Sequence, residues 1–269
     1  MLNKILFSCL SLTLVSLCNI RAEATEVFIC RTKEAFFTEY STIVDDFLKK
    51  SHYTTKEFFT YGNDLDKLIT QNKEFINERT SDGETLLTLS IQRHISPPLT
   101  RRLLDLGALP QNTNEKGLLP ITIAKEMQQQ YSMLPSFDLR LREIINILNI
   151  ETFFSKYQFV INKHLKKLPS YDLTELKNEL LPFLNQNKDL IDKQNEDGST
   201  CLIHAISHMA NTDLVNILLE AGANPLQENS YGKTPEQVIQ DMLLKYSKFP
   251  NLQEPFKQMI KIFKNVQEK

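Results

Sequence analysis

The chain has 269 residues, 24% of them charged and 41% hydrophobic, and its formal net charge at pH 7 is −2. A balance this close to neutrality argues against a nucleic-acid or anionic-membrane partner, because those partners require a clear basic excess. The length accommodates one elongated domain or two compact ones.

The N-terminus has the features of a secretory signal peptide. Lys4 is followed by an uncharged, leucine-rich run over residues 5–20, and Ala22-Glu23-Ala24 fits the small-x-small pattern that signal peptidases cut. The run of 16 residues is shorter than the about 20 that a membrane-spanning helix needs. We expect residues 1–24 to be a signal peptide and the protein to be exported, into the periplasm or out of the cell. An uncleaved N-terminal anchor is the alternative.

Two of the four cysteines leave with this segment. Cys9 and Cys18 lie within it, and only Cys30 and Cys201 remain. Disulfides are therefore not the framework of the fold, although an exported protein meets an oxidising compartment.

The first half of the remaining chain predicts paired helices separated by turns. Asp82-Gly83 and Lys116-Gly117 are tight-turn dipeptides. Gly107 is the glycine expected after the end of a helix, and Pro120 lies near the start of the next. Upstream, degenerate or capping helices are expected at residues 33–50 and 56–72.

The second half predicts the same elements. Residues 136–166 contain no glycine-rich linker, so the helices are expected to continue across the join. Asp197-Gly198 makes a turn, a helix begins at Thr200, and Gly222 ends the second helix. Tyr231-Gly232 makes the following turn. Degenerate helices are expected at residues 151–167 and 172–187.

Glycine spacing reveals a duplication. Six of the seven glycines form two triplets with internal spacings of 24 and 10 residues, offset by 115. Prolines 110, 120 and 135 recur at 225, 235 and 250 with the same offset. Internal repetition determines architecture before local propensity does. We expect two copies of one unit, over residues 25–150 and 151–269.

Within each copy, a turn, two short helices, Gly-Ala-x-Pro and another turn recur over 34 residues. This pattern is similar to the ankyrin repeat. The resemblance lies in residues 197–200, 218–225 and 232–235, with a counterpart at 82–85 and 103–110. It implies an all-α fold, an ankyrin-type α-solenoid of stacked helix-turn-helix repeats. The family's Thr-Pro-Leu-His tetrad is nowhere complete, so its turns are expected to be looser here.

The resemblance also implies a non-catalytic scaffold that binds another protein, without cofactor or metal, and we expect a monomer. In proteins of this kind the turns and the exposed side of the first helix contact the partner. The corresponding residues are Ser81, Asp82, Glu84, Gln92, Arg93, Glu115, Lys116, Glu196, Asp197, Ser199, Ser207, His208, Ser230, Tyr231 and Lys233. Tyr231 is the preferred anchor, because tyrosine is enriched among residues that dominate binding.

Two other functions stay open. Cys201, His204 and His208 are spaced by three and four residues, so a helix places them on one side, and they could serve a metal-binding protein or hydrolase. A fourth ligand is not evident, and a small core residue with two histidines explains the pattern more simply. The sequence has no Gly-x-Ser-x-Gly elbow or glycine-rich phosphate loop. The third possibility is a structural subunit of an envelope assembly.

Overall fold

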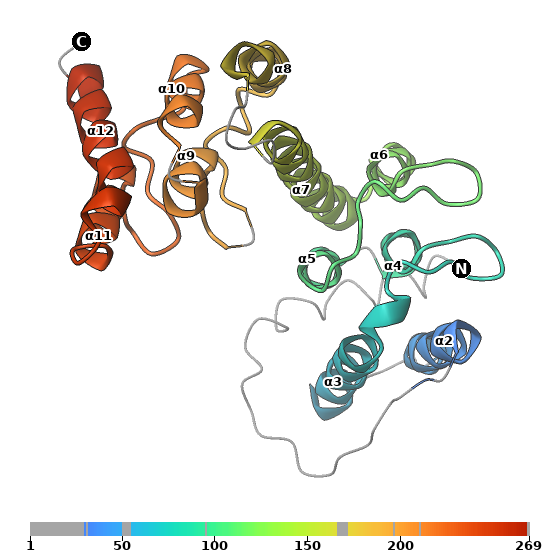
Figure 1. Ribbon diagram of the computed structural model, residues 1–269. Coiled ribbons are helices and arrows are strands. Elements are labelled where there is room, and N and C mark those ends of the chain that lie inside the picture. Colours follow the sequence, from blue (N-terminus) through green and yellow to red (C-terminus); the bar gives the residue numbers. More distant parts are fainter. Residues whose placement is uncertain are drawn as a thin grey trace. The chain divides into compact units, whose positions relative to one another are not determined.

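The computed structural model describes residues 30, 32–49, 55–94, 96–165, 172–195, 197–209 and 211–267. The predicted signal peptide lies outside these ranges. The described elements are helices (Figure 1), and the only extended pairing among them is one antiparallel bridge between Arg79 and Thr85. The predicted all-α class is confirmed. Among the described helices, none has the combination of length and apolar character that crossing a membrane requires.

The chain divides into two compact units, Met1–Asn149 and Ile150–Lys269. Each unit has its own cluster of buried apolar side chains. Helix α7 (Pro135–Leu165) is continuous and contributes residues to both clusters. The expectation of helical continuity over residues 136–166 holds as far as Leu165, where the described range ends.

The first unit consists of helix pairs. Its helices are α2 (Lys33–Lys49), α3 (Thr55–Gln71), the short 3-10 helix η2 (Lys73–Phe75), α4 (Leu86–His94), α5 (Pro97–Asp105), α6 (Pro120–Gln130) and the first part of α7. Helix α2 packs on α3, α4 packs on α5, and α4 also packs on α6. The first helices of successive pairs are thus neighbours, as stacked helix pairs require.

The second unit follows the same plan. It comprises the second part of α7, α8 (Leu173–Gln186), α9 (Cys201–His204), the π-helical turn η3 (Ala205–Met209), α10 (Thr212–Glu220), α11 (Pro235–Lys245) and α12 (Pro250–Gln267). Helix α10 packs between α8 and α12, while α9 and η3 pack on α11. The predicted helical-repeat arrangement is therefore present, with an unpredicted change from α to π geometry at Ala205.

Side-chain caps begin α8, α9, α10 and α11 of the second unit. The Asp172 carboxylate accepts a hydrogen bond from the amide of Thr174 at 2.8 Å, and the Asn211 side chain accepts one from Leu214 at 2.9 Å. Thr234 and Gln237 form a reciprocal capping box. These bonds satisfy backbone amides that the first turn of a helix leaves unpaired.

Helix α10 ends at a glycine. Gly222 has φ of +98°, a left-handed conformation that residues with a Cβ resist. Its amide donates to the carbonyl of Leu219, and the amide of Ala223 donates to that of Leu218. This pair of bonds satisfies carbonyls at the helix end and turns the chain away.

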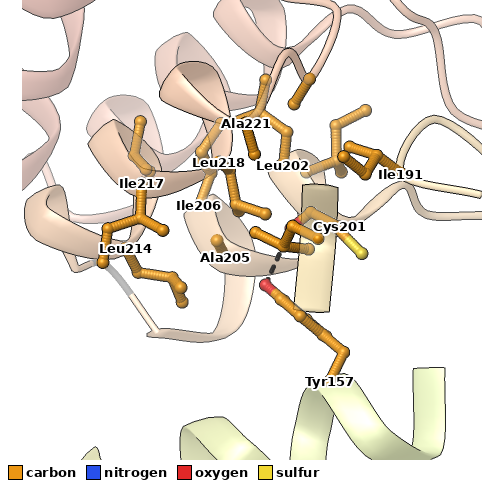
Figure 2. Packing of buried hydrophobic residues seen from close by; sticks show 14 of the residues in the cluster. Tyr157, Ile191, Cys201, Leu202, Ala205, Ile206, Leu214, Ile217, Leu218 and Ala221 are labelled. Carbon is orange, nitrogen blue, oxygen red and sulfur yellow. Dashed lines mark hydrogen bonds between the residues drawn. The ribbon is translucent and has the colours of Figure 1, made fainter. Parts of the chain in front are cut away.

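Apolar side chains from three helices form the centre of the second unit (Figure 2). Leu214 and Leu218 of α10, with Ala221 just after its end, lie against the buried side of α9 and η3. Tyr157 of α7 is fully buried, and its hydroxyl donates to the carbonyl of Cys201 at 3.2 Å. The position of α9 is therefore set by packing on one side and by a buried hydrogen bond on the other.

Candidate protein-binding surface

Tight turns, here called fingers, precede the first helices of the repeats. The first finger of the second unit is closed by the amide of Asn195, which donates to the carbonyl of Ser199 at 3.0 Å. In return, the Asn195 side chain accepts from the Ser199 amide at 2.8 Å. The second finger has the same bonds between Asn229 and Lys233, at 3.0 Å each. Because an asparagine side chain completes both turns, the finger tips have a fixed conformation.

The two fingers of the second unit contact each other. The Ser230 amide donates to the carbonyl of Gly198 at 2.9 Å. Close to their base, the Gln194 side chain donates to the carbonyl of Glu228 at 3.0 Å. These bonds join neighbouring turns without the family's histidine.

The fingers of the first unit are built in a related way. The amide of Thr80 donates to the carbonyl of Glu84 at 2.9 Å, and that of Asn114 donates to Leu118 at 3.0 Å. The Glu84 carboxylate also accepts from the Asn114 side chain at 3.1 Å. Gly83 lies directly against the Glu115 side chain. Here a carboxylate–amide bond and close packing join the two fingers.

A second pair of cross-links ties the base of each repeat to the next. The Asn77 side chain donates to the carbonyl of Gly107 at 2.8 Å and accepts from the Leu109 amide at 2.9 Å. In the second unit, Asp192 accepts from the Asn224 amide at 2.9 Å. Asn77 and Asp192 are 115 residues apart in sequence, as are Leu109 and Asn224. Sequence reasoning missed these residues, although their shared offset was a signal that could have identified them.

The structure places the predicted contact residues mostly on the surface. Tyr231 is 79% exposed, at the tip of the second finger. Also exposed are Ser81, Asp82, Gln92, Arg93, Glu115, Lys116, Asp197, His208, Ser230 and Lys233. Glu84, Ser199 and Ser207 are half-buried. Glu196 lies outside the described residues.

Some of these side chains already have partners within the chain. Lys233 forms an ion pair with Asp241 of α11 at 2.5 Å, and Arg93 lies 3.8 Å from Asp45 of α2. Both pairs are solvent-exposed, and such pairs contribute little to stability. They connect a finger or first helix to its neighbour, so a partner that binds there competes with an internal contact.

The cysteine and histidines proposed as an alternative metal site do not form a ligand set. Cys201 is completely buried, and burial raises the pKa of its thiol well above the ordinary value. The reactive thiolate is therefore disfavoured. The rings of His204 and His208 are stacked, with centroids 4.7 Å apart. Within the described ranges, no group of three histidine, cysteine or acidic side chains is arranged to hold a metal ion.

One segment of the chain matches a known protein family. Residues 197–230 match the family model of the ankyrin repeat. The match begins at the first finger of the second unit, includes α9, η3 and α10, and ends within the second finger. No curated protein matches the chain at a significant level. Ankyrin repeats mediate protein–protein interaction, so the fingers and first helices of this unit are the candidate site.

Proposed function

We propose that the protein is a non-catalytic scaffold that binds another protein through its fingers and first helices. The proposal rests chiefly on Tyr231, an aromatic side chain 79% exposed at the tip of a finger whose backbone is fixed by hydrogen bonds. A large exposed ring on a rigid turn supplies contact area at low entropic cost, which is typical of residues that dominate binding.

The two predicted copies, residues 25–150 and 151–269, suggest two related surfaces. Lys116 is the counterpart of Tyr231 at the offset of 115 residues, and both are exposed finger residues. The two surfaces differ at this position, because the first copy presents the ammonium group of Lys116 and the second copy the phenol ring of Tyr231. The two surfaces therefore suit partner groups of different chemistry. We propose that the second copy supplies the stronger binding surface.

Capture of a partner tests the binding proposal. The chain without residues 1–24 is used as bait, and captured proteins are identified by mass spectrometry and then titrated against variants. Tyr231→Ala is expected to weaken binding by roughly tenfold or more, as a residue that dominates an interface does, with an unchanged melting temperature. Phe249→Ala is the matched control, since Phe249 is 58% exposed in the turn between α11 and α12. Equal binding by wild type and Tyr231→Ala would contradict the assignment.

Lys116→Ala tests whether the partner is bound by one copy or by both. If the second copy is the main surface, this variant binds as the wild type does. A loss as large as that of Tyr231→Ala would show that both copies hold the partner. The same titration therefore measures how the binding is divided between the copies.

Export is the second part of the proposal and rests on the charge pattern and small residues of the first 24 positions. Mass spectrometry of the protein recovered outside the cytoplasm is expected to give an N-terminus at Thr25. Recovery of the full-length chain from the cytoplasm alone would contradict it. Light scattering on the purified protein distinguishes the expected monomer from a subunit of an envelope assembly, which would form a large homo-oligomer.

A further inference from the structure

The first helix of the repeat at residues 197–230 has an irregular geometry. Helix α9 ends at His204 after four residues, and the chain continues as the π-helical turn η3. Isolated π-helical turns are rare and occur frequently at functional sites. This turn carries Ser207 and His208, two of the residues expected to face a partner.

His204 lies at the junction of the two geometries. The residue is only 7% exposed, and its Nδ1 atom is buried, with no hydrogen-bond partner among the described groups. Its ring meets that of Tyr157 edge-on at 6.1 Å and stacks on that of His208 at 4.7 Å, with an angle of 19° between the planes. His208 is itself exposed. A buried imidazole is thus in direct contact with one that solvent reaches.

This arrangement accommodates a neutral His204 but not a charged one. In neutral imidazole one ring nitrogen carries no proton and does not need an acceptor, whereas protonation makes both nitrogens donors. A protonated Nδ1 would therefore be a buried donor without an acceptor. Burial lowers the pKa of His204, the neighbouring His208 lowers it further, and Asp197 opposes both effects.

The other surroundings of His204 are mainly apolar. Helices α10 and α11 pack on α9 and η3 with Leu214, Val215, Leu218, Val238 and Ile239 on their buried sides. Two uncharged titratable groups lie near His204: the buried Cys201 thiol on its own helix, and the Tyr157 hydroxyl of α7, whose ring contacts that of His204. Burial raises the pKa of both. The charged residues of α10 and α11 are at exposed or half-buried positions: Asp213, Glu220, Glu236, Asp241 and Lys245.

The repeat does not require histidine at these positions. Leu89, 115 residues earlier, is 7% exposed in α4, and Val238, 34 residues later, is 8% exposed in α11. The position of His208 is taken by Arg93 in α4. An apolar residue therefore fills the core at the equivalent sites, and the paired histidines are particular to residues 197–230.

We propose that the His204–His208 pair makes this binding face acid-sensitive: the stacked neutral rings hold η3 closed, and protonation opens it. The effect on a partner rests on the proposed function, whereas the opening itself does not. The ligand of this site is the proton, and the consequence is loss of order at Ser207 and His208 in mildly acidic surroundings.

The direction of the pH dependence follows from the lowered pKa. The ordinary pKa of the side chain is 6.5. Since His204 in the closed state has a pKa below this value, the open state binds the proton more readily. The stability of the closed state is therefore fully present above about pH 6.5 and declines as the pH falls below it.

Hydrogen exchange measured by mass spectrometry tests the proposal on the chain without residues 1–24. Rates are corrected for intrinsic exchange and compared between about pH 7.5 and about pH 5.5, a range that spans the ordinary histidine pKa. Protection of Cys201–Met209 is expected to fall by roughly tenfold or more on acidification, because a buried unpaired donor forms. The peptide covering Leu86–Arg93 is the internal control, since Leu89 is the counterpart of His204, and its protection should stay constant.

Two variants make the test specific. His204→Leu restores the residue found at the equivalent position in α4 and is expected to abolish the pH dependence of Cys201–Met209. His208→Gln removes the ring that stacks on His204 and lowers its pKa, without altering a buried residue. This variant is expected to reduce the pH dependence of Cys201–Met209. The proposal is overturned if wild-type protection does not change with pH, or if either variant keeps the full wild-type dependence. A failure of the proposed function would instead appear in the Tyr231→Ala titration at constant pH.

Discussion

Gly198→Ala should destabilise the second unit by separating its two fingers. Gly198 has φ of +72°, and its carbonyl accepts the Ser230 amide. A Cβ at this position would lie well under 3.0 Å from the Oγ and Cβ atoms of Ser230. Ser230 cannot simply rotate away, because its own Cβ is one of the overlapping atoms and its amide is bonded to Gly198.

The expected cost has two parts. A left-handed conformation with a Cβ costs about 1–2 kcal/mol. Separating the fingers loses a hydrogen bond of about 0.5–1.5 kcal/mol and adds overpacking of about 1–3 kcal/mol. Gly232→Ala is the matched control: φ at Gly232 is +69°, but the nearest atom to its added Cβ is 4.0 Å away. We expect a loss of about 2.5–6.5 kcal/mol for Gly198→Ala and about 1–2 kcal/mol for Gly232→Ala.

Equilibrium unfolding in urea, followed by circular dichroism, measures both variants. The first unit offers the same comparison, between Gly83→Ala and Gly117→Ala. Gly83 lies against Glu115, whereas Gly117, at φ of +72°, has open space around it. Equal losses for Gly198→Ala and Gly232→Ala would refute the reasoning, because the cost would then come from backbone conformation alone and the fingers would not be in contact.

Three further changes are expected to have measurable effects. Gly222→Val should cost more than Gly222→Ala in urea unfolding, because a β-branched residue resists φ of +98° although the space around it is open. Tyr157→Phe should lower the stability by about 0.5–1.5 kcal/mol, since it removes one buried hydrogen bond to the backbone of α9, and no loss would show that the bond is not formed. Hydrogen bonds from Lys163 and His164 lower the pKa of Glu179 below its ordinary 4.5. The stability from this carboxylate is therefore present above about pH 4.5 and lost as the pH falls through the lowered pKa, so melting curves of Glu179→Gln and wild type should converge in acid.

The sequence predicted the elements that depend on local chemistry. All six glycines of the two triplets have positive φ, and Pro120 and Pro235 each occupy the first residue of a helix. These residues are informative because their backbone preferences are nearly independent of surroundings. The predicted helices at residues 33–50, 56–72 and 172–187 likewise match α2, α3 and α8 to within one residue at each end.

The sequence did not predict features that depend on packing. The π-helical turn at Ala205–Met209 has no local signal, because residues 201–209 have ordinary helical spacing of apolar side chains. The spacing in the sequence groups His204 with Cys201 as a ligand candidate, whereas tertiary packing buries His204 and stacks it on His208. Hydrogen bonds between repeats, such as that of Asp192 to Asn224, join residues 32 apart and become visible only once the helices are stacked.

Helix α7 limits how the protein can be dissected. Its 31 residues place Phe137 and Leu141 in the first core and Phe153 and Tyr157 in the second. A fragment that stops at Asn149 would end in mid-helix and leave its last four carbonyls without intrahelical donors. A fragment that continues to Leu165 would expose aromatic rings normally covered by α8 and α9. Cleavage or truncation within α7 therefore removes part of this packed helix from one of the two units. Thermal denaturation of the intact chain should be measured before that of any fragment.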